Sequence, residues 1–272
     1  MITSTRHPLV QAFRRAAERP GRDPDRRVVL DGPRLIADAL DAGAVIEHVL
    51  VTREAVAGRL AVLDARLRAG GARVHEAAAR VVQAAADVTT SQGIVALARR
   101  PPVAEDVVLA HPELVLLVAD AVQDPGNLGT MIRTAVAAGA TAVAVTRASA
   151  DPWAPKAVRA TMGAVFKIPL LKSETPQLIE RLLERQAHVY IADAHADLDY
   201  TAAPLIPPLA VVIGNEAAGP DPRWRAAGVR VRIPLWGPIE SLNAAVAAAL
   251  LLYEVARRRA GLGPPARATS AE

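Results

Sequence analysis

The sequence predicts an α/β protein whose larger part is built on a parallel sheet covered by helices. From Leu114 onward, stretches of helical pattern separate the apolar runs LVLLVA, TAVAVT, HVYIA, LAVVIG and VRVRIP. Strands that are apolar throughout are typical of parallel sheets, because the crossover connections place helices on both faces. A shorter alternation of the same kind precedes residue 100. We therefore expect a small α/β domain followed by a larger one.

The domain boundaries follow from the elements expected in the first part of the chain. Strands are expected near residues 28–31, 45–51, 73–75 and 94–98, and helices near 33–42, 54–69 and 77–85. Beyond them, Pro101 and Pro102 remove backbone donors and resist continuation of either kind of element. The predicted divisions are a first domain at residues 1–100, a linker at 101–113, a second domain at 114–259 and a disordered tail at 260–272.

Composition excludes several classes of protein. The chain of 272 residues is 51% apolar and 22% charged, which excludes a disordered or collagen-like protein. The lack of cysteine excludes thiolate nucleophiles, cysteine-bound zinc, iron–sulfur clusters and disulfides. No histidine pair has metal-ligand spacing, so we expect no metal. No signal-peptide-like start or apolar stretch of roughly 18 to 20 residues is present, so we expect a cytoplasmic protein without membrane association.

Positive charge is concentrated at the start of the chain. Residues 1–28 hold seven arginines against three carboxylates, in a chain whose formal net charge is +4. A guanidinium presents a planar fork of donors that suits phosphate oxygens, so the segment indicates contact with nucleic acid. The arginines expected to make this contact are Arg6, Arg14, Arg15, Arg26 and Arg27. A solvated helix face, in a protein that uses arginine in place of lysine, explains the same residues equally well.

The first of three unusual loops follows the run LVLLVA. Asp124-Pro125-Gly126-Asn127 is a turn signal, and Asn127 is expected to cap a helix that begins near Leu128. Arg133 lies within that otherwise apolar helix. A purely structural role explains the proline, the glycine and the asparagine but not the arginine. Because ligands bind beyond the carboxyl ends of parallel strands, Arg133 is a candidate functional residue.

Two further loops follow later strands. In the loop GNEAAGP, which begins at Gly214, small residues let the backbone approach a flat ligand, and Glu216 adds a carboxylate. The stretch IPLWGPIESLN at 233–243 leads into an apolar helix, with Ser241 and Asn243 where a helix cap belongs. Neither a G-x-G-x-x-G pattern nor a P-loop is present, which disfavours a nucleotide-dependent oxidoreductase or a kinase.

Taken in their order along the chain, the three loops closely resemble motifs one, two and three of the SpoU family. Members of this family are the TrmH-like RNA ribose 2′-O-methyltransferases of the SPOUT superfamily. The matching patterns are N-x-G-x-x-x-R, G-N-E-x-x-G and I-P-x-x-G-x-x-E-S-L-N-A, and the stretch 155–166 is similar to the family's middle segment. More loosely, Ile2-Thr-Ser-x-x-x-Pro8 and the stretches 29–35 and 90–94 resemble the N-terminal substrate-binding domain often attached to these enzymes. Pro220 and Ala244 depart from the family pattern but remove no reactive group.

The resemblance implies a C-terminal domain that binds S-adenosylmethionine in a deep trefoil knot, which composition and periodicity do not indicate. It implies that the cofactor is held by Ile213, Gly214, Glu216, Gly219, Ile233, Leu235, Ser241, Leu242 and Asn243. The catalytic residues that it implies are Asn127, Arg133, Glu216, Ser241 and Asn243. Because a guanidinium does not readily give up its proton, we expect Arg133 to hold a phosphate and stabilise the developing alkoxide rather than to act as a base.

The resemblance also implies a homodimer, and enzymes with this extra domain mostly modify large-subunit ribosomal RNA, which we expect as the substrate. Arg34 and Arg133 join the N-terminal arginines as residues expected to contact RNA. Transfer RNA is the alternative substrate. A non-catalytic RNA-binding or ribosome-assembly factor is the alternative from another functional class. Four intact residues argue against it, namely Asn127, Arg133, Glu216 and Asn243. Calorimetry with S-adenosylmethionine discriminates between the two.

Overall fold

The computed structural model describes residues 1–18, 25–86 and 90–262. The chain divides into two compact units, which are described separately. The first unit holds residues 1–103, 124–133 and 150–169, and the second holds residues 104–123, 134–149 and 170–272. Residues 19–24 of the arginine-rich segment and 263–272 of the predicted tail lie outside the described residues.

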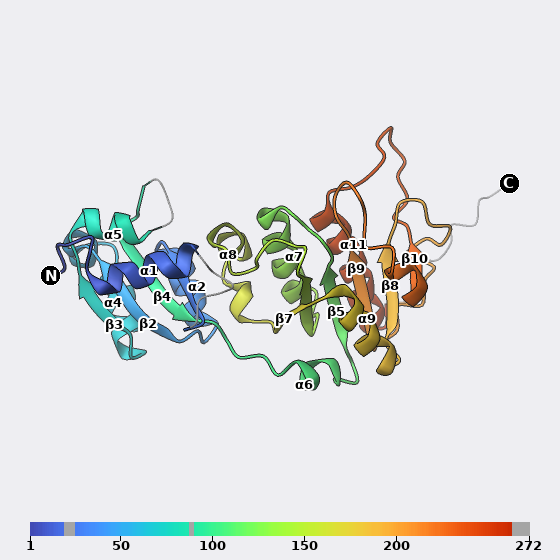
Figure 1. The fold of residues 1–272 in the computed structure, drawn as a ribbon, viewed down its shortest axis with the longest axis horizontal. Helices are drawn as coiled ribbons and strands as arrows, with labels where there is room; N and C mark the ends of the chain where they lie inside the picture. The colour runs from blue at the N-terminus through green and yellow to red at the C-terminus, as the bar shows by residue number, and fades with distance from the viewer. Residues whose placement is uncertain (19–24, 87–89, 263–272) are drawn as a thin grey trace. The chain divides into compact units, whose positions relative to one another are not determined.

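The first unit contains a four-stranded sheet in the order β1-β4-β2-β3 (Figure 1). Its strands are β1 (Arg27–Asp31), β2 (Ile46–Val51), β3 (Arg73–Glu76) and β4 (Ile94–Arg99). β4 is antiparallel to β1 and β2, whereas β2 and β3 are parallel. The strands predicted in this part of the chain are therefore confirmed.

Helices pack against this sheet. The helices are α1 (Pro8–Glu18), α2 (Pro33–Asp41), α3 (Arg53–Ala57), α4 (Ala61–Ala69) and α5 (Ala79–Ala85). α1 and α5 share a buried core with the sheet, to which Phe13, Val82 and Leu97 contribute. The single helix predicted at 54–69 is wrong, because the backbone leaves the helical conformation at Gly58 and two helices form instead.

Glycines allow close packing around α8 in the first unit. α7 spans Pro125–Ala137, α8 spans Pro155–Thr161 and the 3-10 helix η2 spans Ala164–Phe166. A Cβ on Gly129 of α7 would lie 2.5 Å from the Ala157 carbonyl oxygen of α8. A Cβ on Gly163, whose φ is +82°, would lie 2.8 Å from the Cβ of Asp38 in α2. A side chain fits at neither position, so α8 lies directly against α7 and its end lies directly against α2.

The second unit contains a six-stranded sheet in the order β10-β8-β9-β5-β6-β7, and every pairing in it is parallel. The strands are β5 (Val115–Ala119), β6 (Ala142–Thr146), β7 (Leu170–Ser173), β8 (His188–Ala192), β9 (Leu209–Ile213) and β10 (Val229–Val231). Each of the five predicted apolar runs contains one of these strands, and the predicted parallel sheet is confirmed. β7 was missed because LLKS at the sheet edge is half polar and only four residues long.

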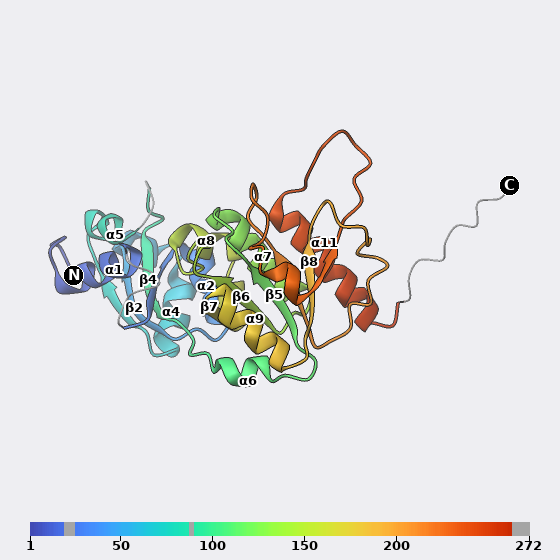
Figure 2. The same cartoon turned by 45° about the vertical axis from the view of Figure 1, so that its right-hand side comes forward.

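Helices complete the second unit (Figure 2). They are α6 (Glu105–Leu109), α9 (Thr175–Glu184), α10 (Trp224–Ala227) and α11 (Ala244–Arg259). α11 packs against β9 and buries Leu251 and Leu252. The stretch predicted as a linker contains α6, which α9 holds through Arg181: its guanidinium lies 2.8 Å from Glu105 and 2.6 Å from Asp106. Within the described ranges, no helix is long and apolar enough to cross a membrane.

Candidate active site

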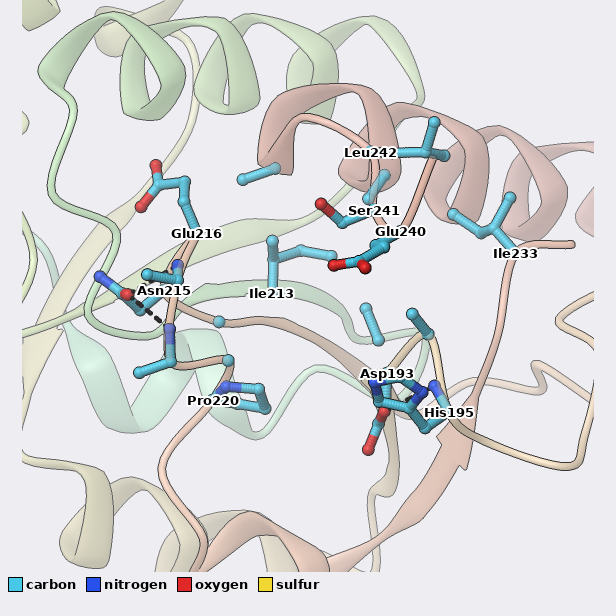
Figure 3. Close-up of a pocket in the computed structure, with 18 of the residues that line it drawn as sticks. Asp193, His195, Ile213, Asn215, Glu216, Pro220, Ile233, Glu240, Ser241 and Leu242 are labelled. Carbon is cyan, nitrogen blue, oxygen red and sulfur yellow. Dashed lines mark hydrogen bonds between the residues drawn. The ribbon is translucent and has the colours of Figure 1, made fainter. Parts of the chain in front are cut away.

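A cavity of about 490 Å³ lies at the carboxyl ends of β8, β9 and β10, three neighbouring strands of the second unit. Because these strands are parallel, the segments that follow them meet at one edge of the sheet. Figure 3 shows Glu216 on one side of the cavity and Asp193 with His195 on another. The structure brings together here the predicted cofactor-binding residues Ile213, Gly214, Glu216, Gly219, Ile233, Leu235, Ser241 and Leu242.

Asn215 organises the loop after β9. It exchanges two backbone hydrogen bonds with Gly219, at 3.0 and 2.9 Å. Its side-chain Oδ1 accepts from the N–H groups of Ala217 and Ala218, both at 2.9 Å. Its Nδ2 donates to the Ala121 carbonyl oxygen at 3.0 Å. The loop is therefore closed on itself and tied to the segment after β5, a positioning role that the sequence interpretation did not assign to Asn215.

The same loop requires glycine at two positions. A Cβ on Gly214 would lie 2.0 Å from the Pro220 nitrogen and 2.3 Å from the Gly219 carbonyl carbon. Both are backbone atoms, which cannot move aside as a flexible side chain can. Gly219 has a φ of +70°, a conformation that L side chains rarely adopt. Bare backbone therefore forms this wall of the cavity, where a flat ligand can approach the chain closely.

Buried Asp120 anchors the end of this loop. Only 1% of the residue is exposed. Its Oδ1 accepts from the Thr175 hydroxyl at 2.9 Å, and its Oδ2 accepts from the Asp221 N–H at 2.7 Å. Hydrogen bonds to both oxygens offset the cost of burying the carboxylate. The sequence interpretation gave Asp120 no role, although a polar residue directly after an apolar strand was the available signal.

The loop after β10 forms a second wall and leads into α11. The side chains that it contributes are Ile233, Leu235, Glu240, Ser241 and Leu242. Asn243 ends the loop: its Oδ1 accepts from the N–H groups of Ala245 at 2.9 Å and Val246 at 3.3 Å. The cap predicted at this position is confirmed. Asn243 is not among the residues that line the cavity.

Asp193, which the sequence interpretation missed, follows β8 and lines the cavity. Burial raises its pKa, but hydrogen bonds from the His195 N–H at 2.9 Å and the Arg230 guanidinium at 3.1 Å bring the pKa below its usual value. The charged side chains that line the cavity are those of Asp193, Glu216, Glu240 and Arg225. Carboxylates outnumber arginine, so the lining favours a ligand with positive charge.

Asn127 lies in the first unit, on α7. The predicted cap was wrong, because α7 begins at Pro125 and the Asn127 N–H donates to the Asp124 Oδ1 at 2.8 Å. Proline is favoured at the first helical position, which moves the helix start ahead of Leu128. Lys156 Nζ lies 2.9 Å from the Asp124 Oδ2, and this ion pair, with the Asn127 N–H, lowers the pKa of Asp124.

Arg133 also lies on α7. Its side chain is exposed, and its Nη1 lies 2.9 Å from the Met162 Sδ at the end of α8. Its predicted catalytic role stays a prediction.

The N-terminal arginines divide into two groups. Arg27 lies within the sheet, 2.6 Å from Asp25 and 2.7 Å from Glu47, and Glu47 also pairs with Arg99. Burial raises the pKa of Glu47, but the two guanidiniums bring it below its usual value. The others expected to contact RNA, all with exposed side chains, are Arg6, Arg14, Arg15, Arg26 and Arg34.

The parallel sheet and the cavity at its strand ends fit a methyltransferase of the SpoU type. The chain belongs to the SpoU rRNA Methylase family: the family model matches residues 114–253, and a model of the MRM3-like substrate binding domain matches residues 7–96. The resemblance, the fold class and the enzyme class predicted from the sequence are confirmed. The protein is an S-adenosylmethionine-dependent methyltransferase.

Among its relatives is the 23S rRNA (guanosine(2553)-2′-O)-methyltransferase RlmP of Bacillus subtilis, 31% identical over 255 residues, which cover 93% of this chain and 98% of the relative. Human mitochondrial rRNA methyltransferase 3 is 29% identical over 306 residues, covering 89% of this chain and 70% of the relative. The AdoMet-bound SpoU methyltransferase AviRb of Streptomyces viridochromogenes has a TM-score of 0.83 at 26% identity, covering 94% of this chain and 99% of that one.

The cavity fits S-adenosylmethionine. Its volume of about 490 Å³ lies within the roughly 300–1,000 Å³ typical of sites for ligands of this size. Gly214 provides a wall of bare backbone that a Cβ would fill, and Ile213 and Leu235 provide apolar surface. The excess of carboxylates suits the positively charged sulfur of the cofactor.

Proposed function

We propose that this protein transfers a methyl group from S-adenosylmethionine to a ribose 2′-hydroxyl in large-subunit ribosomal RNA, in the cytoplasm. The observation that carries the proposal is the cavity at the ends of β8, β9 and β10, lined by backbone and small residues. Its support is the alignment of nearly the whole chain with a 23S rRNA 2′-O-methyltransferase.

The cofactor is held by the two loops that form the cavity walls. Gly214 and Gly219 allow its flat adenosine part to approach the backbone, and Leu242 packs against it from the α11 side. Glu216 and Ser241 supply polar contacts at the exposed edge of the cavity. Asn243 acts on the same loop by fixing the start of α11.

S-adenosylmethionine supplies a methyl group activated by its positively charged sulfur. The chain must hold the ribose in line with the bond that breaks and accommodate the negative charge that develops on the 2′-oxygen. The guanidinium of Arg133 offers a fork of hydrogen-bond donors, so it binds the neighbouring phosphate and stabilises that charge. Asn127 lies six residues earlier on the same helix and orients the nucleotide.

The first domain and its exposed arginines hold the RNA. Arginines bind phosphate oxygens without reading the base, so they supply affinity and orientation. The residues proposed for this role are Arg6, Arg14, Arg15, Arg26 and Arg133, and Arg34 is also proposed to contact the RNA. Arg27 was also predicted to contact RNA. In addition, its ion pair with Glu47 fixes the position of β1, which begins at Arg27. Binding through phosphates makes the affinity fall steeply with salt concentration.

The active form is a homodimer in which α11 contacts a second copy of this chain. Val246, Leu250 and Tyr253 recur at helical spacing on α11 and are 47%, 38% and 54% exposed. A stripe of apolar side chains of this kind is typical of a helix that packs against another. Leu250→Glu should convert the dimer into a monomer in analytical ultracentrifugation, whereas an unchanged sedimentation coefficient would exclude this face.

The test of the proposed function is transfer of tritiated methyl groups from S-adenosylmethionine to RNA from a strain that lacks the gene. Total ribosomal RNA and transfer RNA are supplied separately, and the labelled ribose is mapped. Label in large-subunit ribosomal RNA supports the proposal. Label confined to transfer RNA establishes the alternative substrate, and S-adenosylmethionine binding without transfer to either RNA points to a non-catalytic factor.

A further inference from the structure

The first unit contains a second cavity, of about 190 Å³, that the proposed function does not use. It is formed by the end of β1, by α2, by Gln92 ahead of β4 and by the end of α8. The polar side chains that line it are those of Asp31, Arg34, Asp38, Gln92 and Arg159. Two carboxylates, two guanidiniums and one carboxamide are thus gathered around a space too small for a whole cofactor, since sites for such ligands hold roughly 300–1,000 Å³.

The chemistry of the lining selects a ligand with both donors and acceptors. A phosphate would gain from the arginines, but Asp31 and Asp38 would repel it. The edge of a nucleobase carries both kinds of group. Guanine places two N–H donors side by side, which suit a carboxylate, and the acceptors O6 and N7, which suit an arginine. A neutral base also avoids the repulsion.

Apolar side chains complete the cavity. Leu35 and Met162 line it, and both can pack against the face of a base. Met162 is also the residue whose sulfur lies 2.9 Å from the Arg133 guanidinium. The cavity therefore adjoins the arginine that the family resemblance places in the reaction, within the same compact unit.

Close packing fixes the position of these groups. The approach of Gly163 to Asp38 locks the end of α8 against α2, so that Met162 and Asp38 keep their places. A Cβ on Gly32 would lie 3.3 Å from the Gln92 Nε2, so the carboxamide lies over the bare start of α2. The ion pair between Arg34 and Asp38 is long, at 4.0 Å, and the Arg34 side chain is 81% exposed. Such a pair is weak and rearranges readily when a ligand arrives.

We propose that this cavity binds an unstacked guanine of the RNA substrate, with Asp38 accepting from its Watson–Crick edge and Arg34 donating to O6 and N7. Recognition of single-stranded RNA commonly takes bases out of the stack and reads them in this way. The proposal rests on the proposed function only for the statement that the substrate is RNA. It assigns base selectivity to the junction of α2 and α8, apart from the cavity that binds S-adenosylmethionine.

The test is fluorescence anisotropy with the full-length protein and four labelled RNA pentamers, UUGUU, UUAUU, UUCUU and UUUUU. We expect the G-containing pentamer to bind at least about fivefold more tightly than the others, since one good base contact gives about a fivefold effect or more. Asp38→Asn should remove most of this preference while leaving the affinity for UUUUU unchanged. Arg34→Ala should weaken binding and reduce the preference.

Arg68→Ala is the matched control. It also removes one exposed guanidinium from the first unit, but its partner is Asp64 on α4 and it does not line the cavity. It should keep the preference for UUGUU. Equal affinity of the wild-type protein for all four pentamers overturns the proposal. An equal loss of affinity for all four pentamers in Asp38→Asn also overturns it, because such a loss would indicate a general defect.

S-adenosylmethionine calorimetry and methyl transfer to ribosomal RNA are measured in parallel on each variant. Cofactor binding verifies that the second unit is folded, and a wild-type melting temperature verifies that the first unit, which carries the substitutions, is folded as well. Failure of methyl transfer in the wild-type protein would overturn the proposed function while leaving a guanine preference intact. Active methyl transfer with no base preference would overturn the guanine site alone.

Discussion

Replacing Gly214 by alanine should destroy the cofactor site while leaving the rest of the protein folded. The new Cβ would lie 2.0 Å from the Pro220 nitrogen, 2.3 Å from the Gly219 carbonyl carbon and 2.5 Å from the Pro220 Cα. Ordinary contacts at a Cβ begin at 3.4 Å, so the backbone of the loop must move by more than 1 Å. No side chain can absorb that movement, because all three obstructing atoms belong to the main chain.

A displacement of this size is large for a binding site. A misplacement of about 1 Å can reduce function by about 100-fold, and the loop also carries Glu216. We therefore expect Gly214→Ala to weaken S-adenosylmethionine binding by at least about 100-fold in isothermal titration calorimetry. Methyl transfer should fall in parallel when the cofactor is not saturating.

Gly237→Ala is the control for this substitution. Gly237 lies in the loop after β10, but a Cβ there would meet nothing within 4 Å. This variant should bind S-adenosylmethionine as the wild type does. Near-normal affinity of Gly214→Ala, with a wild-type melting temperature, would refute the reasoning, because the loop would then have accepted a Cβ that its backbone excludes.

Three other substitutions test separate parts of the structure. Arg133→Ala should keep cofactor binding and lose methyl transfer, and normal turnover would remove Arg133 from the mechanism. Asn243→Ala removes the α11 cap and should cost about 1 kcal/mol of stability in thermal or urea unfolding, while an unchanged stability would mean that the cap contributes nothing. Hydrogen bonds from Arg257 lower the pKa of Glu254 below its usual value. Burial opposes this shift, and hydrogen bonding to Arg258 adds to it. The stability that Glu254 contributes is therefore present above its unfolded-state pKa and is lost as pH falls through the folded-state pKa. Glu254→Gln should remove this part of the acid destabilisation. The free energy of urea unfolding should therefore fall less steeply in the variant than in the wild type between about pH 5 and 3. The same pH dependence in both proteins would contradict this prediction.

The sequence predicted most of the fold because its strands are continuous apolar runs. The elements that it missed carry weaker local signals. β7 is a short edge strand with polar residues, and the break between α3 and α4 depends on the backbone conformation at Gly58, which composition does not determine. A knot is a property of how a chain threads through itself, so the expectation of one came only from the family resemblance.

The site was predictable to the extent that its residues lie in loops with unusual composition. The loops that form the walls of the cavity were identified because glycine, proline and asparagine cluster in them. The anchoring residues Asp120, Asp193 and Asn215 were assigned no role, since each acts through partners distant in sequence. Asp120, for example, binds the hydroxyl of Thr175 and the N–H of Asp221. Contacts of this kind depend on the sheet order, which the local pattern does not contain.

The cofactor cavity and the proposed guanine cavity belong to different units of the described chain. The residues that line the cofactor cavity belong to the second unit, whereas Arg133 and the residues that line the proposed guanine cavity belong to the first. Gly214→Ala should therefore lose S-adenosylmethionine binding and keep its preference for UUGUU, and Asp38→Asn should do the reverse. If either variant lost both properties while its melting temperature stayed normal, cofactor binding and base selection would be coupled, and the separate roles argued for the two cavities would be wrong.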